Sequence, residues 1–208
     1  MLTASVQRGI GLVESLVVLV IMALLLALAA PSFSTWIAGT RVRATAESLL
    51  AGLQYARSEA TTRNTQVRFQ LTTSVDDGCA LSTSGLAWVV DMVDAGEGDS
   101  VAGQCGTAPS DTVAPSILQV RAAAEAGGRV QVAAGASEIV FNGLGRRAPT
   151  GGAAAPAAVA IDVAPAGAER QCVADGGGVT CLRILVSPAG QVRLCNPSAP
   201  EGDSQACA

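Results

Sequence analysis

The distribution of apolar and polar residues divides the chain into three parts. Residues 10–30 are almost entirely apolar, and Glu14 is the only charged residue among them. From Arg41 to Asn64, apolar side chains recur at spacings of three and four: Val42, Ala46, Leu49, Leu53, Ala56 and Ala60. This spacing predicts an amphipathic helix whose apolar stripe lies on a core. After residue 64 the apolar positions alternate, which is typical of half-buried strands.

The alternating part predicts a β domain over residues 65–208. In TQVRFQL (65–71), Val67, Phe69 and Leu71 share one face. Further strands are expected at 86–93, 116–121, 129–134, 138–142, 157–163, 179–187 and 190–196, with turns at 175–178 and 187–190. The stretch 151–158, rich in Gly and Ala, is interpreted as a loop. The predicted fold class is α+β: a long N-terminal helix packed on a C-terminal antiparallel β domain.

The apolar segment 10–30 supports three interpretations. As a helix it would be about 31 Å long, enough to cross a hydrocarbon core of roughly 30 Å, so it can be a plain membrane anchor. Residues 27–29, Ala-Leu-Ala, have the form of a secretory cleavage site, which would release a soluble periplasmic binding module. The third interpretation explains Glu14, whose carboxylate costs on the order of 2.5–3.5 kcal/mol in a bilayer core.

In the third interpretation, residues 1–9 are a polar leader that ends in Gly9. Cleavage after Gly9 would free the amine of Ile10, four positions before Glu14 and on the same helix face. A positive amine near this carboxylate, in the same chain or a neighbouring one, offsets the burial cost of both. Glu14 would then set the register of packed helices.

Residues near the end of the apolar segment predict where it leaves the membrane. Pro31 and Gly39 are expected to kink the helix there, because proline removes a backbone hydrogen bond. We expect Trp36 to be an interfacial anchor and Trp88 to be a core residue. The expected division is 10–30 for the transmembrane half of the helix and 31–64 for the amphipathic half.

The cysteines indicate an oxidising compartment. Six cysteines follow the apolar segment, none with C-x-x-C spacing, and an even number behind a membrane or export segment predicts disulfides. Many pairings are compatible with six cysteines. Proximity in the sequence favours Cys79–Cys105, Cys172–Cys181 and Cys195–Cys207.

Charge and composition favour a structural protein over an enzyme. The chain of 208 residues has a net charge of −4, no histidine and no residues spaced as a catalytic triad. Its basic residues are scattered arginines, which predicts no general affinity for polyanions. Asp94, Glu97 and Asp99 imitate part of a Ca²⁺ loop but lack its full ligand series, so a solvated loop is the preferred interpretation. We expect no metal, cofactor or catalytic residue.

The N-terminal residues resemble the class III signal of type IV pilins and type II secretion pseudopilins. Gly9, the apolar residue after it, Glu14 and Pro31 match the positions of that signal, although most members have Phe where this chain has Ile10. The resemblance implies that a prepilin peptidase cuts after Gly9 and methylates the amine of Ile10. It also implies that Glu14 is needed for ordered assembly, with the leader in the cytoplasm and the β domain in the periplasm.

Four further blocks resemble the FimT/GspH family over nearly the whole chain. They are LLAGLQYARSEATTRNTQVRF (49–69), AWVVDMVDAGEGD (87–99), FNGLGR (141–146) and RILVSPAGQVRLC (183–195). The resemblance implies a minor pilin in the tip or priming complex of an inner-membrane type IV pilus, whose partners are other pilins. The same architecture would also suit the H-type pseudopilin of type II secretion.

A third function implied by the resemblance is DNA binding during natural transformation. Some FimT-type pilins bind DNA through a C-terminal Gly-Arg-x-Arg motif, and the matching residues here are Gly190, Gln191, Val192 and Arg193. Glutamine replaces the first arginine, and one arginine rarely holds a phosphate backbone on its own. Arg183 and Arg170 are candidates to assist Arg193. A structural pilin surface remains the preferred interpretation.

Overall fold

The computed structural model describes residues 11–93, 100–123, 129–149, 157–167 and 171–207, without the side chains of residues 29–32. The chain divides into two compact units, Met1–Ile37 and Ala38–Ala208, which are described separately below. One long helix, α1 (Leu12–Arg63), contributes to both units. The helix continues through Pro31 and Gly39, and the kink expected there stays a prediction.

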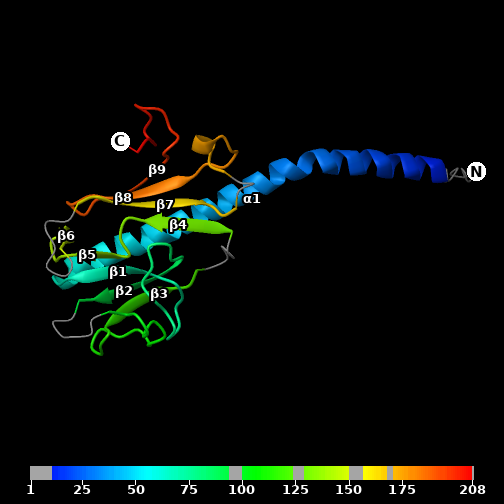
Figure 1. The fold of residues 1–208 in the computed structure, drawn as a ribbon. Helices are drawn as coiled ribbons and strands as arrows, with labels where there is room; N and C mark the ends of the chain where they lie inside the picture. The colour runs from blue at the N-terminus through cyan, green and yellow to red at the C-terminus, as the bar shows by residue number, and fades with distance from the viewer. Residues whose placement is uncertain (1–10, 94–99, 124–128, 150–156, 168–170, 208) are drawn as a thin grey trace, which may run out of the picture. The chain divides into compact units, whose positions relative to one another are not determined.

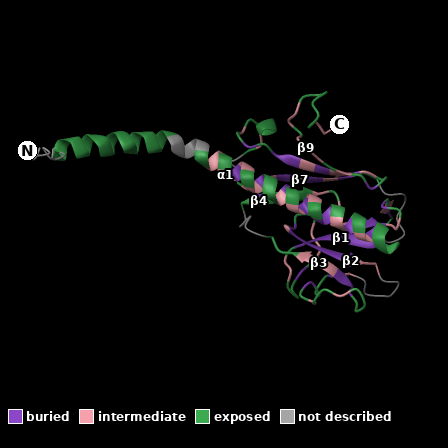
Figure 2. Ribbon diagram, turned by 180° about the vertical axis from the view of Figure 1, so that it is seen from behind, coloured by how far each residue is buried: buried purple, intermediate pink, exposed green. Residues whose placement is uncertain are grey.

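In the second unit, α1 packs on the β domain through the stripe that the sequence predicts. Buried and exposed positions alternate along this part of the helix (Figure 2). The six stripe residues are all at most 1% exposed, so the predicted stripe is confirmed: Val42, Ala46, Leu49, Leu53, Ala56 and Ala60. The helix ends because Asn64 adopts a left-handed conformation (φ 51°) and the Thr65 N–H donates to the Ala60 carbonyl oxygen at 3.2 Å. This is the Schellman type of helix ending.

The described residues of the β domain form two antiparallel sheets (Figure 1). The first sheet has the order β3-β2-β1-β5-β6: Ile117–Arg121, Ala87–Met92, Val67–Thr72, Glu138–Phe141 and Arg147–Ala148. The second has the order β4-β7-β8-β9: Val130–Ala134, Val159–Pro165, Leu182–Val186 and Val192–Cys195. The eight expected strands are all present, with ends displaced by up to three residues. The short strand β6 and the 3-10 helix η1 (Val173–Asp175) were not predicted.

An apolar core joins α1 to the inner faces of both sheets. Its largest fully buried side chains include Phe69 on β1 and Phe141 on β5. Trp88 is 3% exposed, which confirms its prediction as a core residue, and its ring lies 5.7 Å from that of Phe69. A Cβ atom at Gly52 of α1 would come within 2.8 Å of Phe69 and 2.9 Å of Trp88. Glycine is therefore required for the close approach of the helix to the first sheet.

The outer face of the first sheet carries a buried charged network. Arg68 on β1 lies directly opposite Asp91 on β2, with Arg68 Nη2 at 2.5 Å from Asp91 Oδ2. The Gln70 side-chain amide donates to the same carboxylate at 2.9 Å, and Glu138 Oε2 lies 3.6 Å from Arg68 Nη1. A smaller apolar cluster contributes to this side of the molecule: Cys79, Val89, Val101, Cys105 and Ile117. Loops carry part of this cluster. They keep water away from a sheet face whose polar residues would otherwise be exposed.

The structure contains three disulfides, and they join the pairs that are nearest in sequence. Cys79–Cys105, Cys172–Cys181 and Cys195–Cys207 close loops with sequence separations of 26, 9 and 12. The first bridge lies in the cluster on the outer face of the first sheet. The second ties the segment of η1 to the start of β8, and the third ties the C-terminal tail to β9.

Candidate functional site

The first part of α1 presents an apolar surface around its whole circumference. Its large apolar side chains from Leu12 to Leu28 are between 48% and 83% exposed. The same stretch is exposed all round in Figure 2, in contrast to the striped part of the helix after Ala38. An exposed apolar surface of this extent marks contact with a membrane or with other proteins. By length and composition, no single described helix qualifies as a membrane span, but Leu12–Leu28 and Phe33–Arg63 qualify when taken together as a bent pair.

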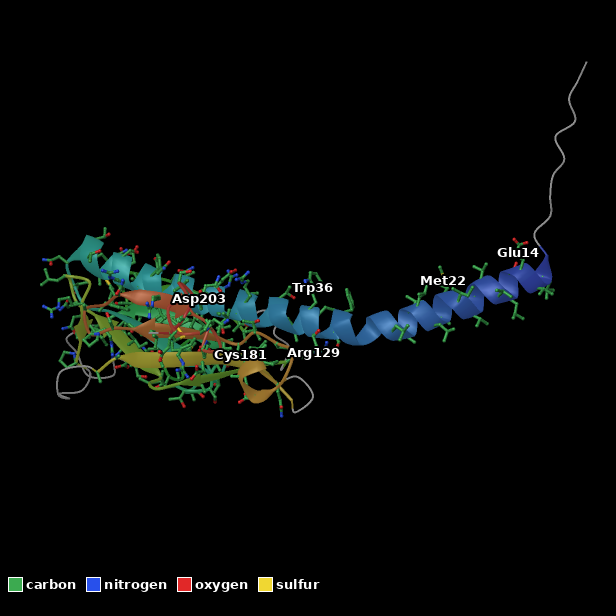
Figure 3. The ribbon with its side chains drawn as sticks, turned by 90° about the horizontal axis from the view of Figure 1, so that it is seen from above. Glu14, Met22, Trp36, Arg129, Cys181 and Asp203 are labelled. Atoms are coloured by element: carbon green, nitrogen blue, oxygen red, sulfur yellow. A yellow bond between two sulfur atoms is a disulfide. The ribbon has the colours of Figure 1, made fainter. Side chains whose placement is uncertain are left out.

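Glu14 interrupts this apolar surface in the first turn of the helix. It is the only charged residue between Arg8 and Arg41. Figure 3 shows its carboxylate projecting from the start of α1. A carboxylate in the first turn interacts favourably with the unpaired N–H groups of a helix N-terminus. Gly9 and Ile10, the expected cleavage site, lie outside the described residues.

The aromatic residues beyond the apolar stretch are also exposed. Phe33 and Trp36 are 62% and 64% exposed, and their stacked rings lie 6.0 Å apart. An aromatic side chain with a polar edge suits a membrane–water interface, so the structure is compatible with Trp36 as an interfacial anchor. That role stays a prediction.

The structure brings two of the three candidate DNA-binding arginines to one sheet face. Arg183 on β8 lies opposite Cys195 and Arg193 on β9 lies opposite Leu185, so the two arginines share the outer face of the second sheet. The Arg183 guanidinium, however, donates to both carboxylate oxygens of Asp162, at 2.6 and 3.1 Å. These hydrogen bonds raise the pKa of Arg183. Arg170 lies outside the described residues.

Three of the sequence blocks that carry the family resemblance meet at one junction. Arg57 Nε on α1 donates to the Gly145 carbonyl oxygen at 3.1 Å. A Cβ atom at Gly190, in the turn between β8 and β9, would come within 1.8 Å of the same oxygen. The neighbouring Arg147 N–H donates to the Pro188 carbonyl oxygen at 3.2 Å. Gly190, which matches the glycine of the family's DNA-binding motif, therefore lies where the two sheets and the helix meet. This is a structural role.

No candidate metal site appears among the described residues. In that part of the chain no three His, Cys, Asp or Glu side chains are grouped to hold an ion. Asp94, Glu97 and Asp99 lie outside it, so their interpretation as a solvated loop stays a prediction.

A helix with an exposed apolar first part, followed by an antiparallel β domain with disulfides, defines the pilin-like class of protein. The family model described as "Type II transport protein GspH" matches residues 45–190, and the chain belongs to this family. Pilins and pseudopilins are structural subunits, anchored in the inner membrane, that assemble with other pilins. No curated protein matches the chain.

Two crystal forms of the type IV minor pilin FimU of Pseudomonas aeruginosa are similar in structure to this chain. One has a TM-score of 0.49 at 19% identity, over 81% of this chain and 96% of the FimU chain. The other has a TM-score of 0.45 at 20% identity, over 80% and 99%.

Proposed function

We propose that this chain is a non-catalytic minor pilin in the tip or priming complex of a type IV pilus. It spans the inner membrane once, with the β domain in the periplasm. The observation that carries the proposal is the exposed apolar stretch Leu12–Leu28, whose sequence contains one charged residue, Glu14. Such a surface is stable in lipid or against other apolar helices, and the family assembles with other pilins. The absence of histidine from the sequence favours a structural role over general acid–base catalysis.

Glu14, the single carboxylate of the apolar stretch, sets the register of the helix against its neighbours. In the proposal, a prepilin peptidase cuts after Gly9 and methylates the amine of Ile10. The positive amine of one chain then pairs with Glu14 of its neighbour, in a medium where an unpaired carboxylate is costly. A helix shifted by one turn would leave both charges unpaired. In the proposal, insertion of a chain into the membrane does not require the ion pair between the amine and Glu14, whereas ordered packing of neighbouring helices does.

Glu14→Leu tests this proposal. The variant should enter the membrane at least as well as wild type, because the insertion cost of a carboxylate is removed. It should fail to assemble, because the amine of its neighbour has lost its partner. Immunoblots of the membrane fraction and of the isolated filament complex measure the two steps separately. Glu47→Leu removes an exposed carboxylate of the second unit and serves as the control. Wild-type assembly by Glu14→Leu would contradict the proposal.

The family description favours a second candidate, the H-type pseudopilin of type II secretion. Both candidates use the same helix and the same cleavage site, so only the filament system differs. Deletion of the gene should abolish piliation in the first case and export of secreted enzymes in the second. Complementation with the wild-type gene controls for effects on neighbouring genes. Minor pilin genes beside it would favour the pilus, and secretion genes would favour the pseudopilus.

A further inference from the structure

One edge of the first sheet extends beyond the region that α1 covers. The central strand β1 is buried at all six positions, whereas β3, at the edge, is buried only at Ile117. A groove of about 330 Å³ lies between β3 and the helix. Its lining consists of Ser48, Ala51 and Tyr55 from α1, Trp88 from β2, and Gln119 and Arg121 from β3. All of these residues belong to the second unit of the chain.

The apolar wall of the groove is held in place by its neighbours. The Trp88 indole N–H donates to Ser48 Oγ at 3.2 Å, which fixes the ring against the helix. One turn further along the same helix, the close approach at Gly52 also packs against this ring. A partner that packs on Trp88 would therefore lose little conformational entropy from the protein side.

The register of β3 determines which of its side chains face the groove. Arg121 lies opposite Trp88 and Gln119 lies opposite Val90, so both point to the inner side of the sheet. In the described part of the chain, β2 is the only strand that pairs with β3. Near the start of β3, the Ile117 carbonyl oxygen accepts from the Ser110 N–H at 2.8 Å. The edge from 118 to 121 can accept another strand, whose alternate side chains would enter the groove.

The charge of the groove lining, which comes from Arg121, favours an acidic side chain beside it. Arg63 lies 2.7 Å from Glu59 and 3.2 Å from Asp111, so it compensates one of these two carboxylate charges, and neither carboxylate lines the groove. Burial, followed by the charge of Glu59, raises the pKa of Tyr55, so this phenol stays neutral at physiological pH. Arg121 is exposed, and no carboxylate of the described residues lies within ion-pair distance of it. The groove thus combines an aromatic wall with one cation.

We propose that this groove binds an extended segment of a neighbouring subunit by adding a strand to β3. The segment carries an apolar side chain that packs on Tyr55, over the largely buried ring of Trp88. Its carboxylate, two residues away, pairs with Arg121. A spacing of two is required because alternate residues of a strand share a face. This inference rests on the proposed function as a filament subunit and adds a second contact to that of the apolar helix.

Peptide binding to the full chain in detergent micelles tests the groove directly. Trp36→Phe leaves Trp88 as the only tryptophan, so its fluorescence reports on the groove. The probe is the acetylated peptide amide Thr-Val-Thr-Leu-Thr-Glu-Thr. One control peptide has Lys in place of Glu, and another has the order Leu-Glu-Thr-Thr, which puts Leu and Glu on opposite faces. The probe should bind about tenfold more tightly than either control, because only it forms the charge-assisted hydrogen bond together with the apolar contact.

Charge reversal at two arginines distinguishes peptide binding in the groove from general electrostatic attraction between the peptide and the protein. Arg121→Glu should reverse the preference, so that the Lys peptide binds more tightly than the Glu peptide. Arg129→Glu makes the same charge change at an exposed position outside the groove and should leave the preference unchanged. Equal effects of the two variants, or no binding of the probe by wild type, would overturn the proposal.

Assembly in cells distinguishes this inference from the proposed function. Arg121→Glu and Ala51→Phe, which fills the groove, should lower incorporation into the filament complex without affecting membrane insertion. If both variants are incorporated as well as wild type while Glu14→Leu fails to assemble, the groove proposal is refuted and the proposed function stands. Wild-type assembly by Glu14→Leu would remove the proposed function itself.

Discussion

At the scale of single residues, two Arg–Asp pairs of the β domain provide a matched comparison. Arg68–Asp91 and Arg183–Asp162 each join residues directly opposite on neighbouring antiparallel strands. The side chains of the first pair are 7% and 0% exposed, and those of the second are 37% and 42% exposed. The same chemical pair therefore occurs in the interior and at the surface of one domain.

Loss of the carboxylate should have unequal effects at these two sites. Asp91→Asn leaves the Arg68 cation buried and is expected to lower the free energy of unfolding by about 3–5 kcal/mol. Asp162→Asn is expected to cost less than about 1 kcal/mol, because water solvates Arg183. Urea titration of the full chain in detergent micelles, followed by circular dichroism, measures both. Equal losses in the free energy of unfolding would show that burial does not determine how much an Arg–Asp pair stabilises the domain.

The candidate DNA-binding residues give a second prediction at this scale. Gln191→Arg restores the first arginine of the family motif and should steepen the fall of log K with log salt by about 0.9 for duplex DNA. Gln54→Arg adds the same charge at an exposed position of α1 and is the control. Titration with labelled duplex DNA at several salt concentrations gives the slopes. If Gln191→Arg and Gln54→Arg change the slope equally, the residues that match the family's DNA-binding motif have no special role in this chain.

At the scale of elements, the disulfides differ in what they hold. Loop closure alone predicts roughly 3 kcal/mol for each bridge, with a difference of less than about 1 kcal/mol between loops of 12 and 26 residues. Cys79 and Cys105 are buried in the cluster on the outer face of the first sheet, the face that also bears the Arg68–Asp91 pair. Cys207, in contrast, belongs to a tail with exposed residues.

The double variant Cys79→Ser/Cys105→Ser should therefore lose more stability than Cys195→Ser/Cys207→Ser. The expected difference exceeds the loop-closure value, because the first variant also removes apolar cover from buried charges. Urea titration compares the two with wild type under non-reducing conditions. A difference within the loop-closure value would mean that the outer cluster contributes little.

At the scale of the whole molecule, the mature N-terminus tests the proposed processing. In a strain with active prepilin peptidase, the purified chain should begin with N-methylated Ile10. Mass spectrometry of the N-terminal peptide measures both the cleavage and the methyl group, and a peptidase-deficient strain should retain the leader. A chain that begins at Ala30 would instead support the secretory signal, and the protein would be a soluble periplasmic module.

Local periodicity in the sequence was sufficient to predict most of the elements. The stripe from Val42 to Ala60 was predictable because its spacing of three and four reflects one face of a helix. The strands were predictable from alternation, as with Val67, Phe69 and Leu71. The three cysteine pairs were favoured because short loops close with the least loss of chain entropy.

Contacts between distant segments were decided only by the tertiary structure. Alternation placed Arg68 on the polar face of β1, yet loops with no regular pattern contribute to its burial beside Asp91. The division of the strands into two sheets, the short β6 and the groove beside Arg121 likewise depend on which segments meet in space. The physical reason is that periodicity encodes which face of an element is apolar. It does not encode which other segment covers that face, and the burial and partner of each charge depend on that cover.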